Sequence, residues 1–291
     1  MSTDRERNLR SIVNGSGFVF QLSIMDNIQR TKDKHGWEIS AHEHPWRNQS
    51  NGNEGYIDII LKRLRGRECL VVECKRTKDA SWIFLNPDNG HDEVTLSKCL
   101  WSDLRESQNA IAEDTKGTSR PVFNIISGWD DFAIEPRSPQ SEFCAIRGSG
   151  ENDKPLLERI CGQLLKSIES LSIEEMEITS GHNPVNAACI YIPVVVTNTQ
   201  LELCHFDPEK VSMSDGLLPN GNFKTVPFIR FRKSLTTIVS SSVKATNLTD
   251  ASKEKERTIL IINSNSLSDF LENFQLKLSH YVDTWPWRLY R

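Results

Sequence analysis

The stretch EGYIDIILKRLRGRECLVVECKRTK, residues 54–78, decides the predicted fold. It predicts two strands, residues 56–61 and 69–75, joined by a tight basic turn. Each strand is apolar until an acid interrupts it, Asp58 in the first and Glu73 in the second. Strands that are apolar on both faces belong in the middle of a sheet. A bare carboxylate there costs several kcal/mol unless another group compensates its charge.

The two acids and a nearby lysine predict a site for a divalent cation. Side chains alternate along a strand, so Glu73 and Lys75 point to one face while Cys74 points to the other. Mg²⁺ takes oxygen ligands and keeps several of its waters. We therefore predict that Mg²⁺ or Mn²⁺ is held by the carboxylates of Asp58 and Glu73 and by the backbone carbonyl of Cys74.

The composition is typical of a soluble globular protein. Of the 291 residues, 37% are hydrophobic and 25% are charged, and a chain of this length can bury a sizeable core. The N-terminal segment is too polar for a signal peptide, and the longest apolar run, residues 189–196, is too short to span a bilayer. The seven cysteines form no C-x-x-C pair, which indicates buried free thiols in a reducing compartment. We expect a cytoplasmic protein with no membrane partner.

Basic residues concentrate around the turn between the two strands. Seven of them lie between Lys62 and Lys78, against two acidic residues, although the formal net charge of the chain is −4. A local patch of this kind attracts a polyanion, although a solvated face is the alternative. The residues that we predict to contact nucleic-acid phosphates are Lys62, Arg63, Arg65, Arg67, Arg76 and Lys78. A second basic cluster comprises Lys224, Arg230, Arg232 and Lys233.

The rest of the chain predicts further helices and strands after a polar lead-in at residues 1–14. A helix over residues 17–34 places Gln21 among its apolar residues, where an amide needs a partner. The other predicted helices cover residues 96–112, 155–171 and 266–278, the last with Ser266 as its N-cap. The other predicted strands cover residues 37–46, 82–85, 122–126, 143–146, 189–196, 201–206, 223–231 and 258–262.

These elements predict a single domain, residues 1–291. Its core comprises residues 15–76 and 155–206, and we expect strand 201–206 to pair with strand 189–196. Residues 77–150 are rich in Gly, Pro, Asp and Ser, so we interpret them as an insertion that decorates the core. A C-terminal strand and helix extension covers residues 223–291.

The order of elements and the motif residues resemble the PD-(D/E)xK nuclease superfamily, whose shared core is an α-β-β-β-α-β unit. Asp58 matches the first acid of the motif, and Glu73-Cys74-Lys75 matches its E-x-K. The segment Gly17-Phe18-Val19-Phe20-Gln21 is similar to the G-x-x-F-E start of the first helix in Mrr-like restriction endonucleases. The resemblance covers residues 15–76 and, more loosely, residues 155–206.

The resemblance implies an α/β fold with a restriction-endonuclease-like core, a central mixed sheet and an insertion after the catalytic lysine. The implied activity is metal-dependent cleavage of phosphodiester bonds, with DNA as the expected substrate, in restriction or anti-phage defence. Lys75 would orient or deprotonate the attacking water. Gln21, which stands where a glutamate is common, would hydrogen-bond a metal-bound water or the Lys75 amine. Ile57 precedes Asp58 where the name of the family has a proline.

Other interpretations stay open at this point. A nucleic-acid-binding or regulatory subunit would keep the fold without catalysis, and a sensor or scaffold would bind a partner through the insertion. Glu73 and Lys75 could form a salt bridge at a sheet edge, and His42 with His44 could bind zinc. Cleavage of both strands of a duplex by one site per chain favours a homodimer. A partner protein of a defence system is a further possible partner.

Overall fold

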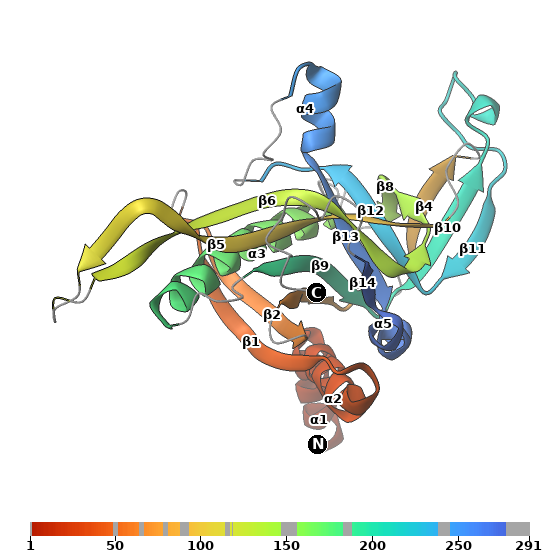
Figure 1. Ribbon diagram of the computed structural model, residues 1–291. Helices are drawn as coiled ribbons and strands as arrows, with labels where there is room; N and C mark the ends of the chain where they lie inside the picture. Colours follow the sequence, from red (N-terminus) through yellow and green to blue (C-terminus); the bar gives the residue numbers. More distant parts are fainter. Residues whose placement is uncertain are drawn as a thin grey trace.

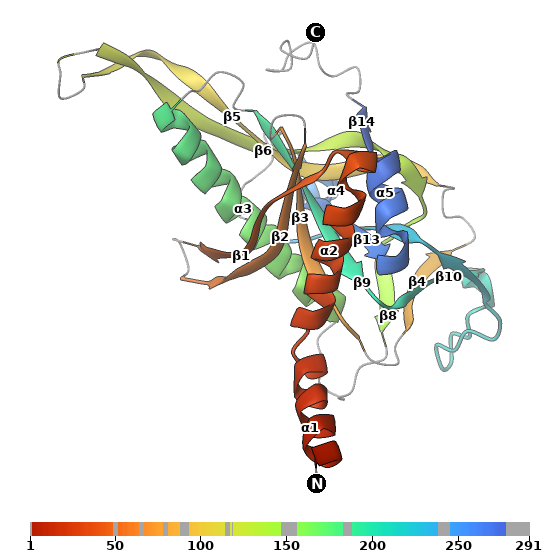
Figure 2. The same ribbon diagram turned by 90° about the horizontal axis from the view of Figure 1, so that it is seen from below.

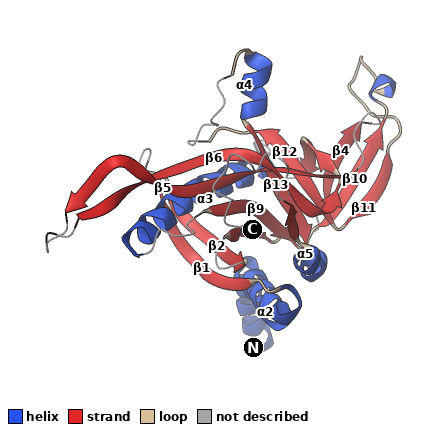
Figure 3. Cartoon of the chain, viewed as in Figure 1, coloured by secondary structure: helices blue, strands red, loops and turns tan. Residues whose placement is uncertain are grey.

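The fold is described from a computed structural model. It describes residues 2–48, 52–63, 67–77, 81–87, 93–113, 117, 119–146, 156–182, 188–237 and 245–277. This part of the chain is a mixed α/β protein in which strands predominate (Figure 3). Its α-helices are α1 (Ser2–Gly15), α2 (Phe18–His35), α3 (Leu156–His182), α4 (Leu248–Glu254) and α5 (Leu267–Asn273). None of the described helices is long and apolar enough to cross a membrane.

The central feature is a large mixed sheet with the order β1-β2-β3-β9-β13-β12-β7. Its strands are β1 (Glu38–Arg47), β2 (Glu54–Arg63), β3 (Glu68–Lys75), β9 (Cys189–Thr197), β13 (Glu256–Asn263), β12 (Phe228–Ser234) and β7 (Gln140–Ser141). The first three are antiparallel neighbours, whereas β3, β9 and β13 run parallel to one another. Every residue of β9 is buried, as its continuous apolar run predicts. The strands predicted at residues 56–61, 69–75, 189–196 and 258–262 are confirmed.

Two long strands form a ribbon that extends beyond the body of the molecule (Figure 1). They are β5 (Val94–Glu113) and β6 (Ser119–Ser138), and β6 also pairs with β14 (Gln275–Lys277). The helix predicted at residues 96–112 is therefore wrong. Leu100 and Trp101 of β5 are buried and pair with β6 on one side and with β9 on the other, and this pairing overrides the helical pattern of the segment.

A second, smaller sheet has the order β11-β10-β4-β8. Its strands are β4 (Ser81–Pro87), β8 (Phe143–Ile146), β10 (Gln200–Phe206) and β11 (Asn222–Val226). Strand β10 forms where the sequence predicts it, but it pairs with β4 and β11 rather than with β9. The single strand predicted at residues 223–231 is divided at Pro227 into β11 and β12, which belong to different sheets. Proline has no backbone N–H to donate, so it ends the ladder there.

Residues 77–150 contribute more than a peripheral insertion. They supply strands β4 to β8, in both sheets. Trp82, Leu100 and Trp129 from this segment are fully buried in the same apolar cluster as residues of β2, β3 and β9. The segment therefore completes the core.

Helices cover both faces of the large sheet (Figure 2). The buried residues Ile24 and Ile28 place α2 on one face, where it packs beside α5. Helix α3 packs its apolar residues into the cluster on the other face. Phe18 and Leu22, two apolar residues of this helix, are exposed, whereas Gln21 is buried as predicted.

The two ends of the described chain differ from the sequence-based expectation. Residues 2–15 form a helix that extends away from the body (Figure 2) rather than a polar lead-in. The closing helix α5 ends at Asn273 and is followed by β14, so it is shorter than predicted. Ser266 occupies the N-cap position of α5 but makes no side-chain capping hydrogen bond.

Candidate functional site

Asp58 lies beside the Glu73-Cys74-Lys75 segment, on the neighbouring strand. Its Oδ2 atom accepts the backbone N–H of Cys74 at 2.7 Å. The antiparallel ladder between β2 and β3 pairs Ile59 with Val72. In the same register the next pair is Asp58 with Glu73, so the two acids lie opposite each other. The strands that carry the two predicted acids are thus joined side by side in the sheet.

Lys75 lies against Glu73, two residues before it on the same strand. The Lys75 Nζ atom is 2.5 Å from the Glu73 Oε1 atom, and both side chains are partly shielded from solvent. The contact is consistent with the alternation of side chains on β3, which predicts one face for both residues. It gives the acidic site a positive charge that is held in place.

Gln21 connects helix α2 to the same site. Its Nε2 atom donates to the backbone carbonyl of Asp58 at 3.0 Å and to Oε1 of Glu43 at 2.6 Å. The sequence-based interpretation allows a hydrogen bond between Gln21 and the Lys75 amine as one option. Among the described residues, no contact between these two side chains is found. Gln21 thus positions the backbone of Asp58 and the side chain of Glu43.

Glu43 is a third acid at the site, and the sequence analysis overlooks it. The register of β1 and β2 pairs His42 with Ile59 and His44 with Ile57, which places Glu43 opposite Asp58. Glu43 has a φ of 47°, in the left-handed region that non-glycine residues seldom adopt. Such a backbone costs about 1–3 kcal/mol, and strained residues of this kind cluster at functional sites. The only sequence signal was its position between two histidines.

The site has an excess of negative charge, and Asp58 shows the effect most clearly. Burial and the neighbouring charge of Glu73 raise the pKa of Asp58 from 3.8 to about 7, and Glu43 contributes in the same direction. The Cys74 N–H and the Lys75 ammonium oppose this rise without cancelling it. Asp58 is therefore partly protonated at neutral pH, and a further cation would favour its ionised form.

The candidate donor atoms are two carboxylates and one backbone carbonyl. This set suits a hard divalent cation that keeps water ligands better than a metal that needs a full set of side-chain ligands. In the described chain no group of three or more His, Cys, Asp or Glu side chains is arranged to hold a metal ion. Asp58, Glu73 and the Cys74 carbonyl would supply oxygen ligands, and Mg²⁺ completes its shell with water. The excess negative charge at Asp58 supports this fit. The zinc alternative is not supported, because His44 bonds to Glu174 at 3.0 Å while His42 is exposed.

Two of the predicted phosphate-binding residues, Lys62 and Arg63, form ion pairs with glutamates of the same chain. Lys62 forms an ion pair with Glu175 of α3. Arg63 bonds to the buried Glu68 at 2.8 Å and stacks on two aromatic rings. Both side chains are partly buried in these pairs, which favours structural support, and their contact with phosphate stays a prediction.

The other predicted phosphate-binding residues have different surroundings. The Arg67 carbonyl accepts the N–H of Ile190 at 2.9 Å, next to the turn. Arg65 and Lys78 lie outside the described residues. Arg76 is exposed, and its guanidinium donates to the Asn14 carbonyl. Of the predicted set, Arg76 therefore remains next to the acidic site and accessible.

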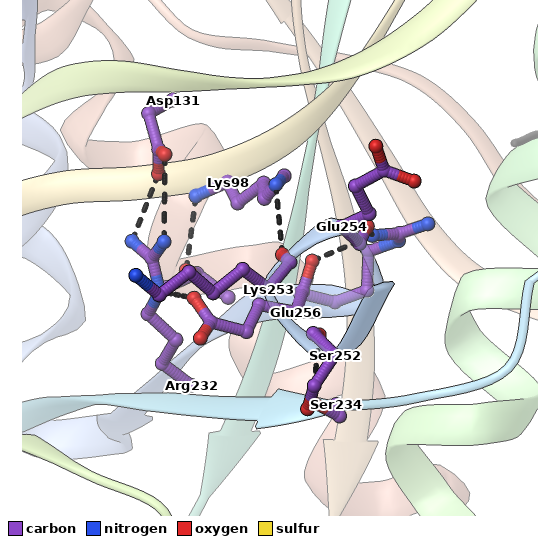
Figure 4. Close-up of polar contacts among 10 residues, drawn as sticks. Lys98, Asp131, Arg232, Ser234, Ser252, Lys253, Glu254 and Glu256 are labelled. Carbon is purple, nitrogen blue, oxygen red and sulfur yellow. Dashed lines mark hydrogen bonds and ion pairs between the residues drawn. The ribbon is translucent and has the colours of Figure 1, made fainter. Parts of the chain in front are cut away.

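The second basic cluster also has internal partners. Arg232 bonds to Asp131 at 2.8 Å and to Glu256 at 2.7 Å (Figure 4). Lys233 bonds to Glu158 at 2.5 Å. Arg230 is fully buried and donates to backbone carbonyls and serine hydroxyls of the β5–β6 region. The charges of these three residues stabilise the fold rather than form a surface for a polyanion.

A pocket of about 340 Å³ lies beside Lys75. It is lined by Lys75, Arg76, Thr77, Trp82, Leu156, Arg159, Ile160 and Gln163. The acidic site and this pocket share Lys75, so a ligand in the pocket would lie next to Glu73.

Comparison of the chain with known protein families, with curated proteins and with solved structures finds no match. The function must therefore be inferred from the site.

Proposed function

We propose that this protein is a metal-dependent nuclease that hydrolyses phosphodiester bonds, with DNA as the expected substrate. The observation that carries the proposal is the hydrogen bond from the Cys74 N–H to Asp58, which brings the first acid against the Glu73-Cys74-Lys75 segment. The connectivity is compatible with it: α2, β1, β2 and β3 follow in the order that the resemblance implies, and α3 and β9 follow after strands β4 to β8, with β3 parallel to β9.

Each residue of the site has a chemical task under this proposal. A divalent cation at Asp58, Glu73 and the Cys74 carbonyl would neutralise negative charge on the phosphate and supply an activated water. The Lys75 ammonium, next to Glu73, stabilises charge that develops on the phosphate oxygens and orients the attacking water. Asp58 must be ionised to act as a ligand, so the metal-free protein should bind a cation more tightly as pH rises through about 7.

Gln21 and Glu43 support these groups rather than replace them. The Gln21 amide holds the Asp58 carbonyl and the Glu43 carboxylate, which fixes helix α2 against two strands. Glu43 adds negative charge that attracts a cation to the site. An amide cannot supply the charge of a carboxylate ligand, so Gln21 is a positioning residue.

The test is cleavage of supercoiled plasmid DNA by the purified protein with Mg²⁺ or Mn²⁺. EDTA is the control for metal dependence, and Asp58→Asn is the control for a contaminating nuclease, because asparagine retains an acceptor for the Cys74 N–H. We expect nicked and linear products from the wild-type protein with metal, and none from the variant. Intact plasmid in every sample, with RNA also uncut, would remove the proposal.

A further inference from the structure

The pocket beside Lys75 differs from the other basic regions because one of its cations, Arg159, has no acidic partner among the described residues. Its lining includes three cationic side chains, Lys75, Arg76 and Arg159, and no acid among the described residues. Arg159 is exposed and forms no ion pair with any described residue. Lys62 and Arg63, in contrast, are each paired with a glutamate. Lys75 pairs with Glu73 and Arg76 donates to the Asn14 carbonyl, so the charge of Arg159 is the one that the described fold leaves unpaired.

Trp82 adds a buried donor to the wall of the pocket. The side chain is fully buried and lines the pocket, and its indole N–H has no hydrogen-bond partner in the described structure. An indole N–H can only donate. Leaving such a group without an acceptor costs about 1–3 kcal/mol. The buried indole N–H groups of Trp37 and Trp129 lack partners among the described residues too and do not line the pocket, so the pocket is assigned on its cationic side chains and not on Trp82.

The wall of the pocket next to Lys75 is held firmly. The backbone N–H of Thr77 donates to Asn198 Oδ1 at 2.8 Å, and the Asn198 amide donates back to the Thr77 carbonyl at 3.1 Å. Leu156, Arg159 and Ile160 come from the first turns of α3. The cationic groups are thus mounted on fixed backbone, which favours binding because little order has to be gained.

We infer that this pocket is a subsite that binds a phosphate group of the nucleic-acid substrate, an inference that rests on the proposed function. Lysine, arginine and indole groups are donors without acceptor atoms, so their complement is an anion made of acceptors. The planar guanidinium of Arg159 or Arg76 suits two phosphate oxygens at once. Because Lys75 belongs to both sites, the bound phosphate lies beside the acids, and the strand end is oriented toward them.

The binding experiment is done in EDTA, so that it does not depend on cleavage. Inorganic phosphate is titrated into the wild-type protein, Arg159→Gln, Trp82→Phe and the control Arg30→Gln, an exposed arginine of α2 that does not line the pocket. We expect Arg159→Gln to weaken phosphate binding about 10-fold and Trp82→Phe about 3-fold, with Arg30→Gln unchanged. Thermal unfolding of Trp82→Phe checks that the core is intact. Equal binding by wild type and Arg159→Gln, or no binding by wild type, would overturn the inference.

Oligonucleotides separate the two sources of the phosphate. Duplexes with a 5′-phosphate or a 5′-hydroxyl end are compared in the same buffer. A loss in Arg159→Gln that is confined to the phosphorylated duplex identifies a terminal monoester, whereas an equal loss for both identifies a backbone diester. Plasmid cleavage with metal is measured separately. Cleavage that needs Asp58 but not Arg159 contradicts the phosphate subsite and leaves the nuclease proposal intact. Phosphate binding without cleavage contradicts the nuclease proposal and leaves the phosphate subsite intact.

Discussion

The carboxylate of Asp58 on β2 accepts the backbone N–H of Cys74 on β3 at 2.7 Å. The bond links the first acid to the middle residue of the Glu73-Cys74-Lys75 segment through main-chain atoms. Because the donor is backbone, an asparagine at position 58 can keep the bond while removing the charge. Variants at this position therefore separate the charge of Asp58 from its structural contact, which makes its titration measurable.

The contribution of Asp58 to the stability of the metal-free protein should fall between about pH 4 and pH 7. Folding raises the pKa of Asp58 to about 7, so the folded state keeps a proton that the unfolded state has lost. The stabilisation is complete below the unfolded pKa and is lost as pH rises through the folded one. Asp58→Asn should remove this loss. In EDTA, the Tm of Asp58→Asn minus that of wild type should increase from pH 5 to pH 7 and then level off; a difference that is constant over this range contradicts the assignment.

Glu43→Gln should weaken metal binding without disturbing α2. Glutamine keeps an oxygen to accept from Gln21, whereas the negative charge that raises the pKa of Asp58 is lost. At pH 8, where Asp58 is ionised in both proteins, we expect Mn²⁺ affinity to fall about 5-fold because one attractive charge is missing. Titration calorimetry measures the change.

Glu38→Gln is the matched control for Glu43→Gln. Glu38 lies on the same strand and forms an exposed ion pair with Lys32 at 2.8 Å, so its loss should leave Mn²⁺ affinity unchanged. If the two variants bind Mn²⁺ equally, Glu43 has no part in the site and its backbone conformation is only structural.

The sequence predicts the acids on β2 and β3 because an acid inside an apolar strand is conspicuous. Glu43 is different, because its place opposite Asp58 depends on the irregular register of β1 near Ile39 and on a positive φ that no local pattern indicates. Alternation along a regular strand cannot predict where such a residue points.

Partners that are distant in sequence explain the other errors. The ammonium of Lys62 meets Glu175, more than a hundred residues along the chain, so a basic run that looks like a phosphate-binding patch is partly an internal ion-pair network. Strand β5 was predicted as a helix because its apolar spacing suits either structure, and only the pairing with β6 and β9 decides between them.

Loss of Arg63 should destabilise the fold rather than weaken DNA binding. Its guanidinium bonds to Glu68, whose side chain is 3% exposed, and donates to the Phe274 carbonyl at 3.1 Å. Arg63→Gln leaves a buried carboxylate without its cation, so we expect a loss of about 3 kcal/mol in the free energy of unfolding, measured in urea.

The double variant Arg63→Gln/Glu68→Gln is the control for this effect. It removes the buried charge as well, so it should recover part of the lost stability. The salt dependence of DNA binding should match that of wild type in both variants. Normal stability together with a flatter salt dependence would return Arg63 to the phosphate surface.

Lys75→Ala should separate chemistry from metal binding. In the wild-type protein the Glu73 carboxylate lies 2.5 Å from Lys75 Nζ. Removing the ammonium frees this carboxylate, so the Mn²⁺ affinity at pH 8 should stay the same or rise. Cleavage should nevertheless fall about 1,000-fold in single-turnover assays at saturating protein, because a charge that stabilises the transition state is lost. Lys32→Ala breaks a comparable Lys–Glu pair on the surface and should cleave like wild type. If Lys75→Ala cleaves at the wild-type rate under these conditions, the Glu73–Lys75 contact is a structural ion pair, and the chemistry proposed for the site is wrong.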